Sequence, residues 1–425
     1  MLSLIIKKIL FGNSNNIEKR VYFWNLAANM LYSLQSAILL LIVTRAGGLS
    51  VAGLFSIIYT TTHMFASLGN YNMRNFQVSD AKNIYSYKTY FSSRIVSCIL
   101  MAIACCIYGV ISYDSISNIC IVLLFTGYRI TDSIEDVYHG YVQKVGRLDV
   151  ASIARSLRIF IATVAFCVSY VINADLFIAT IVLFLSSLLI LIVCLMSMFV
   201  EYPELNVGFG IDKVIKLLVE CMPLCISAFL YNYLVNAPKY AIDRNLSSET
   251  QAIFNILFMP IFVINVLSMF IFNPLVADMG KWWNDKELGK LRKSVFKQTI
   301  IILVMTISIA IAGYVIGWWM LGIVYNVDLA DYKFLLFIML FFGGIAALAN
   351  FYSVVVTIMR KQYFIIVAYI LASITSFLFI DKIVVKFDID GAGYAYGFIM
   401  SIVLVILMIV TFVGLFFRKE NREVS

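Results

Sequence analysis

Residues 176–199 read LFIATIVLFLSSLLILIVCLMSMF, which is 24 consecutive residues without a charged side chain. A helix crosses the hydrocarbon core of a membrane, about 30 Å thick, with roughly 20 apolar residues. Similar stretches recur along the whole chain, and the alternating pattern of a membrane β-barrel is absent, so helices remain as the spanning elements. The sequence therefore predicts an all-α, polytopic membrane protein of about twelve transmembrane helices, at 20–44, 51–68, 90–112, 117–140, 151–172, 176–199, 217–242, 251–275, 297–322, 334–358, 362–381 and 392–417.

The composition excludes a soluble globular protein. The 425 residues are 62% hydrophobic and 13% charged, with a mean hydropathy of +0.94, whereas soluble domains are about half apolar and about a quarter charged. Most of the 32 Lys and Arg residues fall in alternate connections and at the two ends of the chain. Cytoplasmic loops collect such residues, so we expect the N- and C-termini to be cytoplasmic. The net charge of +8 follows from this rule, and nucleic-acid binding is not expected.

The two halves of the chain show a weak internal similarity. An offset of 199 residues aligns three identical pairs, which are Arg45 with Arg244, Phe55 with Phe254 and Ile57 with Ile256. Six helices separate these positions, so the halves would have the same orientation in the membrane; chance alignment of apolar sequence is the alternative. We expect an N-terminal lobe of six helices at 1–200, a cytoplasmic linker at 201–216 and a C-terminal lobe of six helices at 217–425.

Charged residues inside the fourth predicted span are the first candidates for a functional site. Arg129 lies near the middle of the span and is followed by Asp132, Asp136 and His139. At about 100° per residue these four side chains fall within about 80° of one helix face, which Glu135 borders. A charge in the membrane costs several kcal/mol unless it faces a partner or a wet cavity.

Two interpretations of this face remain open. In the first, Arg129 is held by Asp132 or Asp136 in a structural contact between helices. In the second, the face lines a cavity and contacts a substrate or a coupling ion. A guanidinium binds phosphate through two parallel hydrogen bonds, so Arg129 suits an anionic head group. The carboxylates of Asp132, Glu135 and Asp136 would then position Arg129 or take up a proton.

The seventh predicted span has a similar stripe. Asn232, Asn236, Lys239 and Asp243 fall within about 60° of one another, and Pro238 interrupts the backbone hydrogen bonds at the same place. The amides suit sugar hydroxyls and Lys239 suits an anion. Lys239 could instead extend to the membrane interface as a long, charged side chain does.

The first and fifth predicted spans add further polar residues. Asn25 and Asn29 lie on one face of the first span and suit sugar hydroxyls, although hydrogen bonds between helices would use the same groups. Arg155 and Arg158 lie one and two turns inside the fifth span, where a phosphate could enter from the cytoplasm. Topological anchoring explains them nearly as well.

Catalytic and metal-binding motifs are absent from the sequence. It has only two histidines, His63 and His139, and no Walker loop, GxSxG or cysteine–histidine metal spacing. We therefore expect a protein that is not an enzyme, with no cofactor and no metal. Without an ATP site, transport would draw on an ion gradient or on the gradient of the substrate itself, and the choice between proton and sodium as a coupling ion stays open.

Four stretches resemble a known family of membrane proteins. They are NLAANMLYSLQSAILLLIVTRAGGLSVAGLFSIIYTTTHMFASLGNYNMRNFQVSD, YRITDSIEDVYHGYVQKVGRLDVASIARSLR, NAPKYAIDRNLSSETQAIFNILFMP and the late GAGYAYG. Together they resemble the Wzx-type polysaccharide repeat-unit flippases, for O-antigen or capsule, of the multidrug/oligosaccharidyl-lipid/polysaccharide (MOP) exporter superfamily. The order and spacing of the stretches cover nearly the whole chain, and no single piece is a strict motif.

The resemblance implies two six-helix lobes that alternate between inward-open and outward-open forms in the bacterial inner membrane. The implied substrate is an undecaprenyl-pyrophosphate-linked oligosaccharide, and membrane lipids, a polysaccharide polymerase and a chain-length regulator are candidate partners. The family's cavities are cationic, which fits Arg129, Lys239, Arg155 and Arg158 by position. The Pro238–Lys239 pair departs from the plainer run of many relatives, which leaves the basic residue of that helix open.

The candidate residues divide into two groups. The substrate-binding candidates are Arg129, Lys239, Arg155, Arg158, Asn25, Asn29, Asn232 and Asn236. The candidates for coupling or charge pairing are Asp132, Glu135, Asp136, His139 and Asp243. An ion-coupled antiporter for drugs or other small molecules is the alternative function, which basic residues disfavour for cationic drugs. A membrane-embedded polysaccharide polymerase is a weaker alternative.

Overall fold

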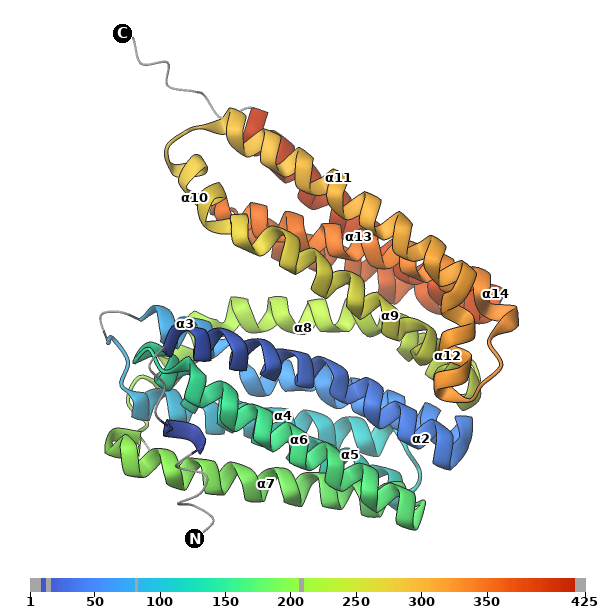
Figure 1. The fold of residues 1–425 in the computed structure, drawn as a ribbon, viewed down its shortest axis with the longest axis horizontal. Coiled ribbons are helices and arrows are strands. Elements are labelled where there is room, and N and C mark those ends of the chain that lie inside the picture. The colour runs from blue at the N-terminus through green and yellow to red at the C-terminus, as the bar shows by residue number, and fades with distance from the viewer. Residues whose placement is uncertain (1–8, 13–16, 81–82, 206–209, 417–425) are drawn as a thin grey trace. The chain divides into compact units, whose positions relative to one another are not determined.

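The computed structural model describes residues 9–12, 17–80, 83–205 and 210–416, and within these ranges it contains helices and no strand. Figure 1 shows the arrangement. The α-helices of ten residues or more are α2 (Ile17–Asn70), α4 (Tyr87–Ser112), α5 (Ile116–Lys144), α6 (Leu148–Asn173), α7 (Leu176–Glu201), α8 (Val214–Asn245), α9 (Ser248–Phe272), α11 (Leu288–Ala312), α13 (Lys333–Ile358) and α14 (Tyr363–Phe416). The shorter elements are α3 (Met73–Ser79), η1 (Pro203–Leu205), η2 (Asn273–Leu275), α10 (Val276–Asn284), the π-helical η3 (Gly313–Gly317), α12 (Trp318–Tyr325) and η4 (Ala330–Tyr332).

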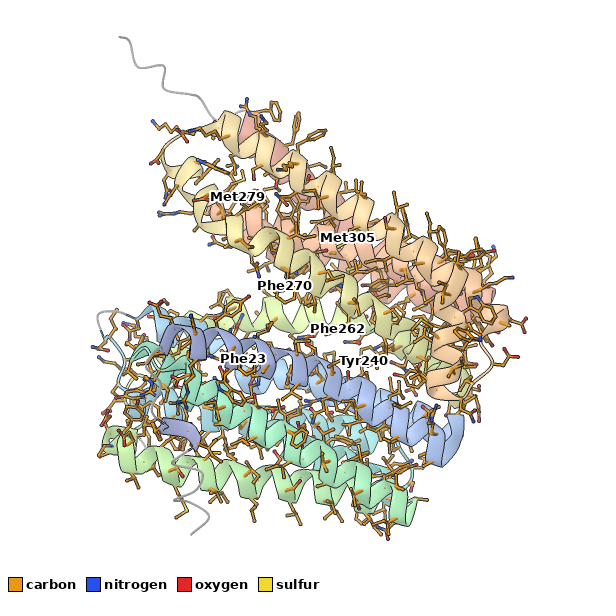
Figure 2. All side chains as sticks on the ribbon, in the orientation of Figure 1. Phe23, Tyr240, Phe262, Phe270, Met279 and Met305 are labelled. Carbon is orange, nitrogen blue, oxygen red and sulfur yellow. The ribbon has the colours of Figure 1, made fainter. Side chains whose placement is uncertain are left out.

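The length and composition of the helices confirm a multi-pass membrane protein. In the described part of the chain, nine helices are long and apolar enough to cross a membrane. Large apolar side chains also remain on the surface, such as Phe262 and Phe270 of α9, each 53% exposed and labelled in Figure 2. Lipid replaces water around such side chains, so their exposure costs little. The number of segments that cross the membrane, twelve by sequence, stays a prediction.

The helix α2 folds back on itself at Gly48. Its 54 residues include Gly48 with φ 80° and ψ 175°, which is not a helical conformation. The hydroxyl of Tyr59 donates to Gln35 Oε1 over 3.4 Å, and Tyr32 lies 3.1 Å from Nε2 of His63. A straight helix would separate residues 35 and 59 by about 36 Å. The two halves of α2 therefore lie side by side, and the break falls between the predicted spans 20–44 and 51–68.

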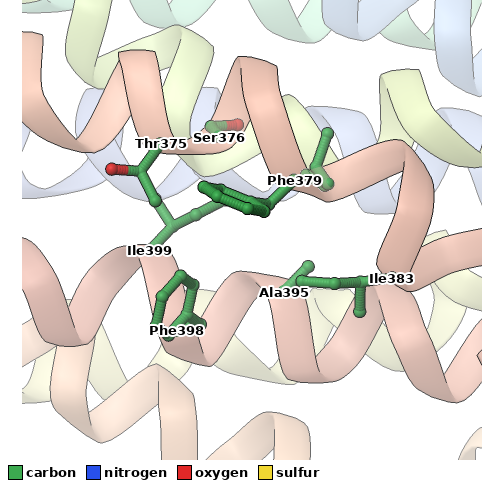
Figure 3. Close-up of a pocket in the computed structure, with 8 residues that line it drawn as sticks. Thr375, Ser376, Phe379, Ile383, Ala395, Phe398 and Ile399 are labelled. Carbon is green, nitrogen blue, oxygen red and sulfur yellow. The ribbon is translucent and has the colours of Figure 1, made fainter.

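The helix α14 has the same construction around Asp388, whose φ of 55° and ψ of −139° break the helix. Figure 3 shows Thr375 and Phe379 of the first half facing Phe398 and Ile399 of the second half across a narrow hollow. The hollow has no room for a water molecule. The break lies between the predicted spans 362–381 and 392–417, so α14 also supplies two adjacent helices.

The chain divides into two compact units, Met1–Phe229 and Leu230–Ser425. The division falls inside α8, and residues 206–209 of the predicted linker 201–216 lie outside the described residues. The boundaries of the predicted lobes therefore stay a prediction. The two ends, 1–8 and 417–425, also lie outside the described residues, and the cytoplasmic position of both termini stays a prediction.

Unit 1 is held together by aromatic side chains and by α6. Helix α6 packs against α2 and α7, while α5 packs against α4 and α7. The ring of Phe55 lies 5.9 Å from that of Phe125 and 6.1 Å from that of Phe166, and all three are buried. These rings form an apolar core in unit 1. Phe125 lies on α5 one turn before Arg129, so the polar residues of α5 begin next to this core.

In unit 2, α13 packs against α9, α11 and α14. Small residues let the backbones approach closely. A Cβ atom on Gly344 of α13 would lie 2.1 Å from Cγ2 of Thr306, and a Cβ on Gly397 of α14 would lie 2.3 Å from the ring of Phe342. Larger side chains at these two glycines would push the helices apart.

Candidate functional site

Arg129 lies inside unit 1 with its guanidinium only partly satisfied. Its side chain is fully buried, and its Nη1 donates to Oδ2 of Asp132 over 3.2 Å. The guanidinium carbon lies 4.4 Å from the centre of the Tyr59 ring and 5.3 Å from that of Tyr128. Among the described residues, Nε and Nη2 of Arg129 have no hydrogen-bond partner. Asp132 is thus the acidic partner of Arg129, and two donors of this arginine remain unused.

Arg158 joins three helices through hydrogen bonds and ion pairs. From α6 its Nη2 donates to Oε2 of Glu135 over 2.7 Å and also to Oδ1 of Asp132, both on α5. Its Nη1 donates to the hydroxyl of Ser187 on α7 over 2.9 Å. Arg158 is fully buried, and a buried ion pair needs such additional hydrogen bonds to offset desolvation. This geometry favours a structural role for Arg158.

Asp136 belongs to a separate group of contacts. It accepts a hydrogen bond from Nη2 of Arg94 over 2.8 Å, and Nη1 of Arg74 lies 3.5 Å away. Arg94 also donates to the backbone carbonyl of Gly69 over 2.8 Å. Sequence reasoning missed Arg74 and Arg94, because the cytoplasmic bias of basic residues already explained them. One feature of the sequence could have pointed to these arginines: the polar face of α5 has more carboxylates than Arg129 alone can pair with.

Arg155 rests on an aromatic ring rather than in a direct ion pair. Its guanidinium carbon lies 4.3 Å from the centre of the Tyr32 ring, and the hydroxyl of Tyr32 lies 3.1 Å from Nε2 of His63. No carboxylate within the described ranges lies within ion-pair distance of Arg155. A cation that is held on an aromatic face, with no carboxylate in direct contact, is suited to an anionic ligand.

The remaining candidates on α2 and α5 lie as follows. Nε2 of His139 is 3.8 Å from Oε1 of Glu135, and both side chains are buried. On α2 the Asn29 amide lies 3.5 Å from the side-chain oxygen of Asn25, and Asn29 is exposed. Nε2 of His139 has no hydrogen-bond partner among the described residues, so His139 lies beside Glu135 without being bonded to it.

In unit 2 the predicted stripe on α8 is only partly brought together. Lys239 is buried, and its Nζ lies 4.5 Å from the centre of the Phe258 ring. Nδ2 of Asn236 donates to the backbone carbonyl of Asn232 over 2.9 Å, whereas Asp243 is exposed. In the described part of unit 2, no carboxylate lies within ion-pair distance of Lys239. Lys239 is thus similar to Arg155, because each cation contacts an aromatic ring and neither has a carboxylate within ion-pair distance among the described residues.

The cluster around α5 carries more positive than negative groups. Three carboxylates, those of Asp132, Glu135 and Asp136, accompany five guanidinium groups, those of Arg74, Arg94, Arg129, Arg155 and Arg158. Within the residues that the structure describes, no group of three His, Cys, Asp or Glu side chains could hold a metal ion. The arrangement is therefore suited to holding an anion.

Comparisons with known proteins match the fold alone. No protein-family model and no curated protein matches the chain. A solved structure described as the inward-facing conformation of a multidrug resistance MATE family transporter of the MOP superfamily is similar, with a TM-score of 0.65, 11% identity and coverage of 92% of this chain and 97% of that chain. The Vibrio cholerae MATE transporter VcmN is similar with a TM-score of 0.59, 13% identity and 99% coverage of both chains.

A third similar structure is a MOP superfamily transporter from Pyrococcus furiosus, with a TM-score of 0.57, 12% identity and 96% coverage of both chains. Its description states that a reversed polarity of the binding pocket suggests a different function. At these identities the likeness establishes only that the chain shares the fold of these proteins.

Proposed function

We propose that the protein is a flippase that moves undecaprenyl-pyrophosphate-linked oligosaccharide repeat units from the cytoplasmic to the outer leaflet of the bacterial inner membrane. The MOP fold supports alternating access between two six-helix lobes. The observation that carries the cargo assignment is Arg155, which is stacked on Tyr32 and has no carboxylate partner, beside a cluster with excess guanidinium groups. The product would supply O-antigen, capsule or a related surface polysaccharide.

The chemistry of the substrate head fits this cluster. A pyrophosphate carries several negative charges and many acceptor oxygens, and guanidinium groups bind such oxygens in pairs. No described carboxylate forms a direct ion pair with Arg155, and Arg129 has two donors without a partner among the described residues. Within unit 2, Lys239 is a second candidate for binding an anion, and the amides of Asn25 and Asn29 in unit 1 and of Asn232 and Asn236 in unit 2 are candidates for binding sugar hydroxyls. In this account Asp132, Glu135, Asp136, His139 and Asp243 pair charges or take up the coupling ion.

An ion-coupled drug antiporter is the second candidate function. The observation in its favour is the likeness to multidrug transporters. A cationic drug would need a pocket with unpaired carboxylates, but Asp132 and Glu135 are both bound to Arg158 and Asp136 is bound to Arg94. The Pyrococcus furiosus transporter, whose description reports reversed polarity, offers a precedent for a different cargo on this fold.

Deletion of the gene distinguishes the two functions. The flippase proposal predicts loss of surface polysaccharide, with lipid-linked repeat units accumulating on the inner leaflet. Complementation with Arg155→Lys should restore more polymer than complementation with Arg155→Gln, because the lysine keeps the charge. Unchanged polysaccharide together with greater sensitivity to toxic compounds would instead support the drug antiporter. The lipid-linked units are the substrate in this proposal, and a polysaccharide polymerase and a chain-length regulator are its candidate protein partners.

A further inference from the structure

An apolar groove runs along the contact between α6 and the first half of α2 in unit 1. Its volume is about 240 Å³. The rim consists of apolar side chains that remain exposed, with Phe160 57%, Val164 45% and Val168 53% exposed on α6 and Ile38 38% exposed on α2. The groove therefore opens on the surface of the unit through a hydrocarbon rim.

Two polar side chains line the floor of the groove, and they already bond to protein groups. Nε2 of Gln35 donates to the hydroxyl of Thr163 over 2.9 Å, and Oε1 of Gln35 accepts from Tyr128 over 2.8 Å and from Tyr59 over 3.4 Å. A cavity holds water only where polar groups need partners, and roomy apolar cavities bind hydrocarbons instead. The groove is thus suited to an apolar chain.

A cation lies at one end of this groove. Ile159 lines the groove, and Arg155 precedes it by one turn on the same face of α6. On α2, Tyr32 precedes the lining residue Gln35 by nearly one turn, and the Tyr32 ring holds the guanidinium of Arg155 at 4.3 Å. The same pair of helices therefore presents a cation without a carboxylate partner and, next to it, a hydrocarbon groove.

We propose that this groove seats the phosphate-proximal part of the polyprenyl chain of the substrate, with the phosphate on Arg155. The inference rests on the flippase function and adds to it the place where the lipid chain is held. A 150 Å³ apolar cavity accommodates benzene, so the groove holds roughly ten carbon atoms, or two isoprene units. The groove has the volume of part of one hydrocarbon chain, and the polyprenyl lipid of the proposed function has a single chain.

The test uses undecaprenyl phosphate with a photoactivatable diazirine in its second isoprene unit. The purified full-length protein in lipid nanodiscs is irradiated with this probe, and the labelled peptides are identified by mass spectrometry. We expect labelling of residues 31–38 and 159–168. Unlabelled undecaprenyl phosphate in excess should reduce it at least fivefold, and equal phosphatidylglycerol should leave it within twofold. Equal competition by the phospholipid would overturn the proposal in favour of an ordinary lipid site.

Variants separate the groove from the rest of the surface. Val164→Trp fills the groove and should reduce labelling at least fivefold, while Leu189→Trp, at a 55% exposed position of α7, should leave it within twofold. Arg155→Gln should also reduce labelling, and Arg155→Lys should restore part of it. If Val164→Trp does not fold, as judged by thermal unfolding, Val168→Trp fills the other end. Unchanged labelling in a folded groove variant would overturn the proposal.

Polymer output in cells distinguishes failure of the groove from failure of the flippase function. If the groove variants keep normal labelling and gene deletion abolishes surface polymer, the groove assignment is wrong and the flippase function stands. If gene deletion leaves the polymer unchanged, both are wrong, whatever the groove binds.

Discussion

At the scale of single residues, Arg158 and Arg155 differ in what their removal leaves behind. Arg158→Met would leave Asp132 and Glu135 buried without the cation that both contact. Breaking a buried ion pair in this way costs about 3–5 kcal/mol, so we expect a large fall in the thermal unfolding temperature in detergent. The matched change Arg155→Gln breaks no direct ion pair among the described residues, and the contact with Tyr32 that it removes is worth about 1 kcal/mol.

Thermal unfolding of the two purified variants checks this difference. Arg155→Gln should unfold close to the wild type and yet lose transport, whereas Arg158→Met should be unstable. Adding Asp132→Asn and Glu135→Gln to Arg158→Met should recover part of the stability. Equal losses of stability in both single variants would show that the two arginines do not have different roles.

Asp80, in the connection between α3 and α4, gives a prediction about pH. Burial by itself raises the pKa of Asp80. Hydrogen bonds from the amides of Ile84 and Tyr85 and the hydroxyl of Tyr90, together with the positive charge of Lys144, lower the pKa by more than burial raises it. The pKa of Asp80 therefore lies below its usual value. The stabilisation is therefore fully present above the unfolded-state pKa of about 3.9 and is lost as pH falls through the lower folded-state pKa.

We expect Asp80→Asn to lower the unfolding temperature at pH 7, since an amide accepts these hydrogen bonds less strongly. The difference from the wild type should shrink as the pH falls below about 4. Unfolding temperatures measured between pH 3 and pH 7 check this expectation. A difference that stays constant over the whole range would show that the charge of Asp80 does not contribute.

The sequence predicted the polar face of α5 but not all of its partners. The spacing of Arg129, Asp132 and Asp136 follows from helix geometry alone. The pairing of Asp132 and Glu135 with Arg158 depends on which face α6 turns toward α5, which is a property of tertiary packing. The pairing of Arg94 with Asp136 also depends on tertiary packing. A basic residue near a helix end is expected from the cytoplasmic bias of such residues, so the position of Arg94 in the sequence did not point to a pairing role.

At the scale of elements, the breaks in α2 and α14 make two hairpins from two long helices. Both breaks lie between predicted spans, Gly48 between 20–44 and 51–68 and Asp388 between 362–381 and 392–417. The sequence did not predict the short helices α3 and α10 or the π-helical turn at Gly313–Gly317. Segments this short bury too few side chains to leave a periodic pattern.

Substitutions at the two breaks are predicted to change the stability of the protein in opposite directions. A Cβ on Gly48 would meet no atom within 4 Å, but its φ of 80° and ψ of 175° are adopted almost only by glycine, so Gly48→Ala should cost about 1–3 kcal/mol from the backbone conformation alone. Asp388 has a positive φ that glycine adopts without strain, so Asp388→Gly should raise the unfolding temperature. Thermal unfolding of both variants checks the signs. Stabilisation by Gly48→Ala would contradict the break at that residue.

At the scale of the whole molecule, the fold and the cargo rest on different observations. The MOP transporter fold is shared with proteins of 11–13% identity, so the arrangement of helices is compatible with very different side chains. The cargo must therefore follow from the charges in the site. In unit 1 the arginines outnumber the carboxylates around α5, and in unit 2 Lys239 lies on Phe258 without an acidic partner.

The most direct measurement is movement of lipid-linked oligosaccharide by the purified protein in proteoliposomes. Fluorescent undecaprenyl-pyrophosphate-linked oligosaccharide is placed in one leaflet, and its arrival in the other is followed by chemical quenching, with imposed proton or sodium gradients. Our account predicts protein-dependent flipping that Arg155→Gln abolishes and Leu189→Trp preserves. Flipping at the rate of protein-free vesicles under every gradient, alongside gradient-driven uptake of a cationic drug by the same protein, would contradict it.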